Sequence, residues 1–519
     1  MVIMKKRNRT TALLLAALML SAQAALTSCS DNGEAVDGAD TRNSSEQENV
    51  NESSAGAESE SETETEADPS LKDDLPTDMK DYDGRDFTVV GYDYTGGAIA
   101  WHVVDIYSET LTGERVNDSV YERNSKIEDR FGVKIKENLQ KDPNSYAKQV
   151  SASSDEFQLL QTDIINLASL ATQGYLLNLK EFDYIDFDKA WWDKTANDSL
   201  SILGRTYYAI GDSQLNAKKA TWVVLFNKKL TNDADLPDLY AEVREGKWTL
   251  DNLKKYGMVI AQDANGDGEM VWEDDVFGIG LQYDVSSPLL LGTGERVVTI
   301  EDDGTYEYLL GSEAIMNTLE KIWEFFNKDK TCLINWNDHQ SRPNIWVEAR
   351  NLFMADQVGF YMTHLGTVVL VGGDMQSDFG ILPIPKVNEY QEDYCSSFQY
   401  YNANAVGAMK STKDTAFTGL ITEAYEMYAH DTVLPAYYTY TLTHRNARDE
   451  ESGEMLDIIF KKRNLDITFA FDKETSIQST ISGVVKSESY NFASTEKAKR
   501  KLMTKQIDKI IASFESLDD

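Results

Sequence analysis

Cysteine and histidine are scarce in this chain, and their spacing excludes several kinds of site. The 519 residues include 3 cysteines and 5 histidines. No two cysteines form a CxxC pair, so the sequence contains neither a zinc-ribbon spacing nor a disulfide framework. Apart from Cys29 only Cys332 and Cys395 remain, and the sequence leaves open whether they pair. The histidines show no metal-ligand spacing, so we expect no catalytic zinc.

Positive charge is also in short supply. The chain has 50 lysines and arginines against 87 aspartates and glutamates, for a net charge of −37. Nucleic acids and anionic lipid surfaces would be repelled by such a protein before any contact formed. The composition therefore argues against both as ligands, and it disfavours an anionic solute.

We also find no internal repeat.

An apolar stretch near the N-terminus, residues 10–26, follows Lys5, Lys6, Arg7 and Arg9. It is too short, and its side chains are too small, for a stable membrane span. A positively charged start followed by such a stretch is typical of a secretory signal peptide. We therefore expect residues 1–28 to be a signal peptide and the protein to be exported.

The signal peptide ends in the residues LTSC, at positions 26–29. This end resembles the bacterial lipobox, in which small residues fit the signal peptidase and the cysteine thiol receives a diacylglycerol. Cys29 would then be the mature N-terminus, and acyl chains such as palmitate would anchor it to the extracellular face of the cell membrane. The alternative is an ordinary signal peptide with an unrelated cysteine.

Residues 30–70 have almost no apolar content. They contain thirteen acidic residues and one basic residue, Arg42, and they end in the run ESESETETEAD. Such a segment cannot bury a core and repels itself, so it should stay disordered. We expect residues 29–82 to be the lipidated cysteine followed by an acidic tether.

The stretch DANGDGEMVWED, residues 263–274, matches a calcium loop. Such a loop needs oxygen ligands at positions 1, 3, 5 and 12 and a glycine at position 6. The matching residues are Asp263, Asn265, Asp267, Gly268 and Asp274, with the backbone carbonyl of Glu269 at position 7. The alternative is a polar turn, since NGDG favours positive φ with or without a metal. A single copy with a helical pattern on one side only predicts a structural calcium clip, not a sensor.

The remaining body, from about residue 83 to 519, is too long for one ordinary core and suggests two domains. RDFTVVGYDY, TDIIN and ATWVVLF predict strands, and VGFYMTHLGTVVLVG and YNANAVGAMK are later strand predictions. NDSVYERNSKIEDRFGVKI predicts a helix capped by Asn117 or Asp118 and then a strand. This alternation predicts α/β domains with mostly parallel sheets, where ligands bind at loops beyond the strand ends.

The order of these segments resembles the extracellular solute-binding proteins of the large carbohydrate-associated family served by ABC importers. The stretches that carry the resemblance include NDSVYERNSKIEDRFGVKI, TDIINLASLATQGYLLNL, YYAIGD before VVLFNKKL, REGKWTLDNLKKY, ARNLFMADQVGFYMT, DFGILPIPK and ARDEESGEMLDIIF. The DxNGDG loop at residue 263 is similar to an insertion in members of the clostridial type. The resemblance covers nearly the whole body.

The resemblance implies a two-lobed periplasmic-binding-protein-like fold of the type II kind. Each lobe would be a mostly parallel sheet flanked by helices, and a hinge of two or three crossing strands would join them. The crossings would lie near residues 222–226, near residues 400–402 and near Pro435. Lobe one would combine residues 83–220 with 400–432, and lobe two residues 221–399 with 433–519. By the same resemblance the protein is a monomer without enzymatic activity or organic cofactor, and it delivers a solute to ABC permease subunits.

We expect the solute to be an oligosaccharide. Sugars present an apolar C–H face and a rim of hydroxyls, so their sites combine flat aromatic rings with carboxylates and amides. Residues of these types at predicted strand ends or crossings are Trp101, Asn166, Asp212, Tyr283, His364, Tyr401 and Asn402. For the aromatic residues and His364 the alternative is packing inside a lobe. Of the adjacent Trp191 and Trp192, at most one would line the rim of the cleft.

Two other classes of protein fit parts of the sequence. A secreted glycoside hydrolase would also be acidic and aromatic, and would act through two carboxylates across a cleft. Among the 87 acidic residues no pair stands out, so the sequence gives this class no positive support. A surface adhesin with the same lipid anchor is the second alternative.

Overall fold

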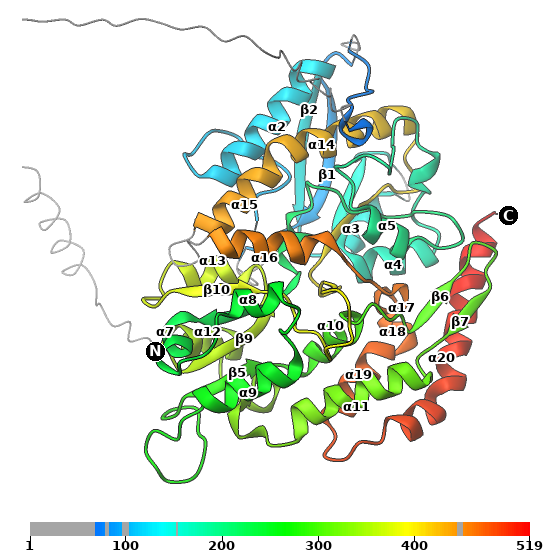
Figure 1. Ribbon diagram of the computed structural model, residues 1–519. Helices are drawn as coiled ribbons and strands as arrows, with labels where there is room; N and C mark the ends of the chain where they lie inside the picture. The colour runs from blue at the N-terminus through cyan, green and yellow to red at the C-terminus, as the bar shows by residue number, and fades with distance from the viewer. Residues whose placement is uncertain (1–67, 78–81, 96–102, 152–153, 444–449, 519) are drawn as a thin grey trace, which may run out of the picture. The chain divides into compact units, whose positions relative to one another are not determined.

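Two β-sheets, each covered by helices, organise the part of the chain that the structure describes (Figure 1). The computed structural model describes residues 68–77, 82–95, 103–151, 154–443 and 450–518. The predicted lipidation site Cys29 and the predicted ligand residue Trp101 lie outside the described residues. Residues from Glu66 onward form one unit, and everything below concerns that unit.

The first sheet has the strand order β11-β3-β1-β2. Its strands are β1 (Arg85–Tyr92), β2 (Val133–Gln140), β3 (Leu159–Asp163) and β11 (Asn404–Gly407). β1 is parallel to β2 and β3, whereas β11 is antiparallel to β3. The sheet thus brings β11 beside strands that come much earlier in the chain.

Helix α2 (Arg115–Phe131) connects β1 to β2 and packs beside α14 (Thr415–Asp431) over the first sheet (Figure 1). The carboxylate of Glu114 accepts the backbone N–H groups of Val116 and Asn117 and so caps the helix. The cap predicted at Asn117 or Asp118 is therefore wrong. Asp118 instead accepts the N–H groups of Thr112 and Gly113 and fixes the preceding loop.

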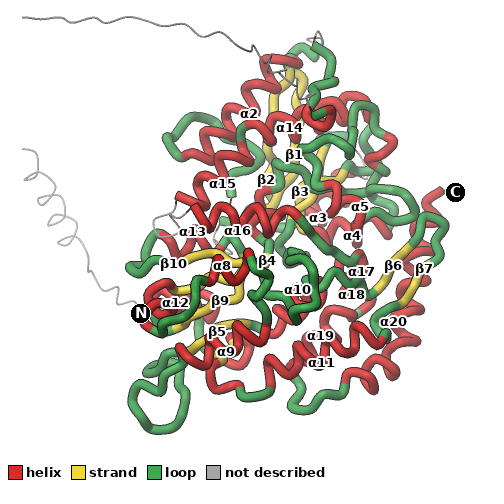
Figure 2. Tube along the Cα trace, viewed as in Figure 1, coloured by secondary structure: helices red, strands yellow, loops and turns green. Residues whose placement is uncertain are grey.

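The second sheet has the order β10-β4-β9-β5-β8. Figure 2 labels β10, β4, β9 and β5 among its strands. Its strands are β4 (Trp222–Asn227), β5 (Phe277–Leu281), β8 (Leu333–Asn335), β9 (Val358–His364) and β10 (Phe379–Leu382). β5 is parallel to β8 and β9, but β4 is antiparallel to β9 and to β10. The α/β fold class is confirmed, while this sheet is mixed where a mostly parallel one was expected.

Further elements complete the described chain. The helices on the N-terminal side of β5 are α3 (Pro143–Ser151), α4 (Ile164–Thr172), α5 (Lys194–Leu200), α6 (Leu215–Lys219), α7 (Lys228–Asp233), α8 (Leu239–Arg244) and α9 (Leu250–Ile260). The later ones are α10 (Ser286–Leu291), α11 (Glu313–Asn327), α12 (Ile345–Met354), α13 (Thr367–Gly372), α15 (Val433–Thr443), α16 (Glu450–Lys461), α17 (Ile467–Ala470), α18 (Asp472–Thr475), α19 (Ile477–Lys486) and α20 (Phe492–Glu515). A small hairpin pairs β6 (Val298–Ile300) with β7 (Tyr306–Tyr308). Residues predicted to extend the strand after His364 form α13 instead.

The chain passes between the two sheets in paired segments. Trp222 donates its backbone N–H to Ser397, at 3.0 Å, and Gln399 donates to Ala220, also at 3.0 Å. These segments, residues 220–222 and 397–399, are the crossings expected near β4 and before β11. The crossing expected near Pro435 does not lie there, because α15 packs on α2 and α14. The next helix, α16, packs on β10 of the second sheet, so the chain changes sheets between α15 and α16.

The core follows the alternation of side chains along the strands. In β4, Val223 and Leu225 enter one cluster of buried residues, while Trp222, Val224 and Phe226 enter another on the opposite face. Every residue of β4 is buried, as a strand covered on both faces requires. The whole of β4 is therefore held rigidly next to the crossing.

Both cysteine thiols in the described part of the chain, those of Cys332 and Cys395, are buried and form no disulfide. No helix among the described residues has the length and apolar character that a membrane span needs.

Candidate functional site

Polar side chains gather where the strands of both sheets end. β3 ends at Asp163, which pairs with Asn404 at the start of β11. In the second sheet β9 ends at His364, which pairs with Trp222 at the start of β4. Strand ends and crossing segments thus meet in one region of the folded molecule. Ligands bind at such strand ends in α/β folds.

A pocket of about 110 Å³ lies at the carboxyl ends of β1 and β3. Its lining includes Tyr94, Asp105, Gln161, Asn216 and Asn404, which come from four different parts of the chain. Asp105, Gln161, Asn216 and Asn404 are all buried. Sequence reasoning missed these four residues. The available signal was a polar residue within an apolar stretch, as in LLQTD and NANAVGA.

A second pocket, of about 260 Å³, shares Val103 and Val104 with the first. It adds Lys219 at the end of α6, Gly366 just after β9, and Tyr437 and Tyr440 on α15. Residues attached to both sheets therefore line this pair of pockets. A molecule bound here would contact both lobes at once.

The charges at these pockets are strongly affected by burial. Burial raises the pKa of Asp105 to about 7, although Arg123 and Lys219 act in the opposite direction. Burial lowers the pKa of Lys219 to about 8, while Asp105 acts to raise it. The guanidinium of Arg123 is already engaged, because it donates to the backbone carbonyls of Asp105 and Ile106 at 2.8 and 2.7 Å.

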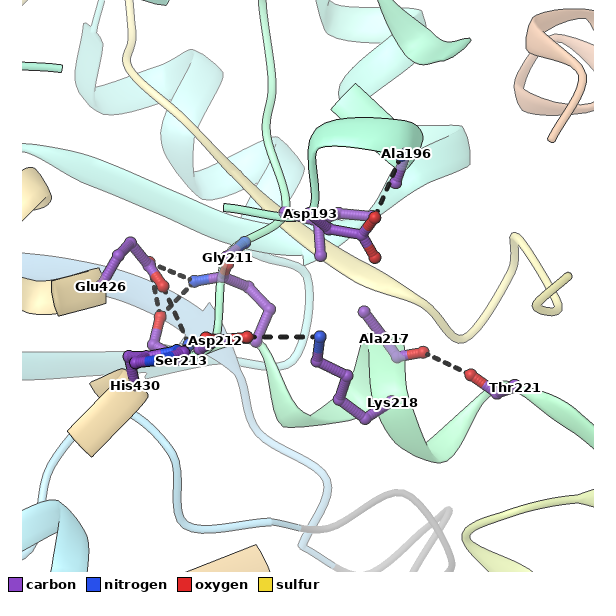
Figure 3. Close-up of polar contacts among 12 residues, drawn as sticks. Asp193, Ala196, Gly211, Asp212, Ser213, Ala217, Lys218, Thr221, Glu426 and His430 are labelled. Atoms are coloured by element: carbon purple, nitrogen blue, oxygen red, sulfur yellow. Dashed lines mark hydrogen bonds and ion pairs between the residues drawn. The ribbon is translucent and has the colours of Figure 1, made fainter. Parts of the chain in front are cut away.

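Asp212, one of the predicted ligand residues, is buried in a network of polar contacts (Figure 3). One carboxylate oxygen lies 3.3 Å from Lys218 Nζ, and the other lies 2.7 Å from Nδ1 of His430 on α14. Both oxygens are thus used inside the protein. We assign Asp212 to the support of the crossing segment and not to the binding of solute.

The same network continues to both sides of Asp212. Glu426 on α14 accepts from the backbone N–H of Ser213 at 2.8 Å and from its hydroxyl at 2.6 Å (Figure 3). Asp193 lies 3.3 Å from Arg463, and the guanidinium of Arg463 donates to Thr221 Oγ1 at 3.4 Å. Burial acts to raise the pKa of Asp193, but the charges of Arg463 and Lys218 hold it below its ordinary value. The network connects α14 and α5 to the crossing that enters β4.

Asn166 and Tyr401 lie near a group of carboxylates. The Asn166 amide donates to Asp163 at 2.5 Å and accepts from Lys473 of α18 at 3.5 Å. Tyr401 is 45% exposed, and burial and the charges of Asp472 and Asp284 raise the pKa of its hydroxyl. An exposed ring beside polar groups is available to stack on a sugar, and Asn402 beside it donates to Gln399.

Tyr283 and His364 have different surroundings. The Tyr283 hydroxyl donates to Asp338 at 3.0 Å, and its ring stacks on Phe326. It lines a pocket of about 500 Å³ whose lining residues all lie between positions 268 and 342, so a solute there would contact one lobe only. His364 is half-buried with its ring centroid 4.0 Å from that of Trp222, and burial lowers its pKa to about 3. His364 therefore stays neutral next to the crossing.

Trp191 and Trp192, of which at most one was expected at the rim of the cleft, are both buried. Their indole N–H groups donate to the two oxygens of Glu423, at 2.8 and 2.9 Å. The pair belongs to the core below the first sheet and not to the rim.

The loop of residues 263–274 forms tight turns around Asp263. The carboxylate of Asp263 accepts the N–H groups of Gly266 and Gly268, both at 2.7 Å, and both glycines have positive φ. Asp267 accepts from Asn265, and Asp274 is exposed. The buried Asp275 closes the loop by accepting from Ala264 and Val271. Within the described ranges, no three His, Cys, Asp or Glu side chains gather as a cation site. Asp263, Asp267 and Asp274 therefore do not gather around one point.

The ion pair between His430 and Asp212 predicts a pH-dependent stability. The hydrogen bond to Asp212 raises the pKa of His430, so the pair stabilises the folded state fully below the unfolded pKa of about 6.5. This contribution is lost as the pH rises through the folded pKa. We expect His430→Gln to lower the melting temperature more at pH 6 than at pH 9, measured by scanning calorimetry. In an Asp212→Asn background the same substitution should lose that pH dependence, and an equal loss at both pH values would contradict the assignment.

Comparison with known proteins gives a clear result for the fold. The sequence matches no model of a known protein family and no curated protein. An ABC substrate-binding protein from Listeria monocytogenes, solved with cycloalternan, aligns with a TM-score of 0.51 at 15% identity, over 82% of this chain and 99% of that one. A sugar transporter from Rhizobium etli aligns with a TM-score of 0.52 at 12% identity, over 83% and 99% of the two chains. UgpB from Mycobacterium tuberculosis, solved with glycerophosphocholine, aligns with a TM-score of 0.51 at 12% identity, over 82% and 99%. The described chain therefore has the two-lobed α/β fold of periplasmic-type solute-binding proteins.

Proposed function

We propose that this protein is an extracellular receptor that captures an oligosaccharide between two lobes and delivers it to the permease of an ABC importer. One observation carries the proposal: the two adjoining pockets at the crossing segments are lined by residues attached to both sheets. A solute bound there favours the closed arrangement because it contacts both lobes only when they are together. The paired backbone segments at residues 220–222 and 397–399 would form the hinge.

The polar lining supports a saccharide as the solute. Asn216, Asn404 and Gln161 offer amide groups, and Tyr94 in the smaller pocket and Tyr437 and Tyr440 in the larger one offer aromatic faces with hydroxyls. This combination suits a molecule with an apolar face and a rim of hydroxyls. The Listeria protein was solved with cycloalternan, which agrees with this choice, whereas UgpB was solved with glycerophosphocholine. The fold alone therefore does not determine the solute, which depends on the side chains that line the site.

Calorimetric titration of the full chain with a panel of oligosaccharides and amino acids tests the proposal. We expect at least one saccharide to bind and to raise the melting temperature with dose. Tyr440→Ala should weaken that binding by about 1–3 kcal/mol, because Tyr440 lines the larger pocket and an aromatic face buried by the solute is lost. Tyr390→Ala is the matched control, since Tyr390 is 95% exposed and lies outside both pocket linings.

Two outcomes would change the conclusion. Binding of amino acids with no response to any saccharide would reject the saccharide as the solute, but the proposed receptor function would stand. Chromatography of the titrated saccharides after incubation checks the hydrolase alternative, and the appearance of shorter products would replace the receptor by an enzyme.

The proposal includes a lipid anchor at Cys29, supported by the residues LTSC after an apolar stretch. Cys29→Ala should abolish lipidation, because the thiol is the acceptor of the diacylglycerol. Detergent-phase partitioning of whole-cell extracts would then show the variant in the aqueous phase, in the medium or as an unprocessed precursor. Cys332→Ala is the control, since its thiol is buried in the body. Unchanged partitioning of the Cys29 variant would reject the anchor.

The proposal also includes calcium in the loop of residues 263–274, supported by its pattern of oxygen ligands and by the two glycines with positive φ. Calcium would then stabilise the folded protein by about 2.7 kcal/mol at a hundredfold excess over its dissociation constant. We expect a chelator to lower the melting temperature, and Asp263→Ala to abolish that effect. Asp303→Ala is the control, because Asp303 also accepts in a turn, from Thr305, but lies outside the pattern. If the chelator does not change the melting temperature, calcium binding is rejected and the loop is a polar turn.

A further inference from the structure

The pocket of about 110 Å³ at the ends of β1 and β3 is built from unusually well-buried polar side chains. Asp105, Gln161, Asn216 and Asn404 are between 0% and 5% exposed. They reach the pocket from separate elements: the segment before α2, strand β3, helix α6 and the start of β11. Four such groups at one place do not stabilise a packed core, because a buried polar group without a partner is destabilising.

The amide nitrogens in this group are used inside the protein. Gln161 donates through Nε2 to the Asp105 carboxylate at 3.0 Å. Asn216 donates through Nδ2 to the Tyr94 hydroxyl at 3.3 Å, and Asn404 bonds to the same hydroxyl. In each of these three side chains, the amide nitrogen faces its partner inside the protein, so the amide oxygen points away from that partner.

No described residue donates a hydrogen bond to the three amide oxygens. Gln161 Oε1, Asn216 Oδ1 and Asn404 Oδ1 are each buried without a donor in this part of the chain. All three residues line the same pocket, as do the carboxylates of Asp105 and Glu137. The pocket therefore offers acceptors, and a ligand that fits it must bring donors.

Among the groups common on saccharides, a primary ammonium brings the most donors. It carries three N–H groups, one positive charge and no acceptor, whereas each hydroxyl donates once and brings lone pairs toward the same oxygens. The facing charges agree with this choice. Asp105 and Glu137 line the pocket, and the guanidinium of Arg123 donates to backbone carbonyls. Lys219 lines the neighbouring larger pocket, and its charge acts to lower the pKa of Asp105. The chain's net charge of −37 also favours the approach of a cation.

We infer that this pocket binds the primary ammonium group of an aminated saccharide, with the amide oxygens of Gln161, Asn216 and Asn404 and the carboxylate of Asp105 as its acceptors. The inference rests on the proposed function, because it names the class of oligosaccharide that the same site takes. The sugar ring would extend from this pocket into the larger one, past Val103 and Val104, which line both.

Calorimetric titration of the full chain with matched ligands tests the inference. Glucosamine oligosaccharides carry free amines, and N-acetylglucosamine oligosaccharides of the same length lack the charge and two of the three donors. We expect the first set to bind at least tenfold more tightly than the second, which corresponds to about 1.4 kcal/mol. Asp105→Asn should remove most of that preference. Asp188→Asn should leave it intact, because this carboxylate is exposed and paired with Lys194 at 2.6 Å.

A second measurement needs no variant and so does not depend on the folding of Asp105→Asn. Methylammonium and tetramethylammonium chloride carry the same charge, but only the first has N–H donors. Methylammonium should raise the melting temperature of the unmodified chain and tetramethylammonium should not. Equal effects of the two salts, together with equal affinities for free and acetylated saccharides, would overturn the inference while the receptor stands. If no saccharide binds but methylammonium alone stabilises the chain, the ammonium pocket stands and the proposed function fails.

Discussion

Buried charges hold the place where the chain leaves the first sheet and enters β4, and the rest of the structure depends on them. Asp212 contacts Lys218 and His430, and Arg463 joins Asp193 to Thr221 just before the strand. A buried charge without a partner is strongly destabilising, so these pairs tolerate little change in relative position. Since residues 220–222 also pair with 397–399, the network supports one side of the crossing between the two sheets.

The polar groups near this crossing fall into two kinds. In the network around Asp212 the carboxylates are paired with Lys218, His430 and Arg463. In the pocket beside Asn404 the amide nitrogens are satisfied and the oxygens are not. Both kinds are buried to a similar degree, so burial alone does not separate them. The hydrogen-bond partners do, because they pair the carboxylates of the first group and leave the amide oxygens of the second without a donor among the described residues.

Much of the fold was open to prediction from the sequence. The strands around Val89, Val224 and Phe360 follow apolar patterns that any buried strand must have, and the fold class follows from their alternation with helices. Boundaries that rest on one side chain were less predictable. The cap of α2 falls on Glu114 because its carboxylate reaches two N–H groups, while Asp118 is engaged by the preceding loop. The antiparallel pairing of β4 with β9 was equally hidden, since pairing partners come from distant parts of the chain.

The sequence by itself determined the features that depend on composition and on near neighbours: the acidity, the strand and helix periodicities, and the signal and calcium-loop patterns, read as predictions. It also predicted Asn166 at a strand end, but β3 ends at Asp163 and Asn166 lies in α4, because Asp163 caps that helix through the N–H of Asn166. Only the tertiary structure decided which polar side chains meet. Asp212 and Asn404 look alike in the sequence, as polar residues beside apolar strands, but one meets a lysine and a histidine and the other faces a pocket. The reason is physical: whether a buried polar atom is satisfied depends on groups brought to it by folding from far along the chain, and local sequence carries no record of them.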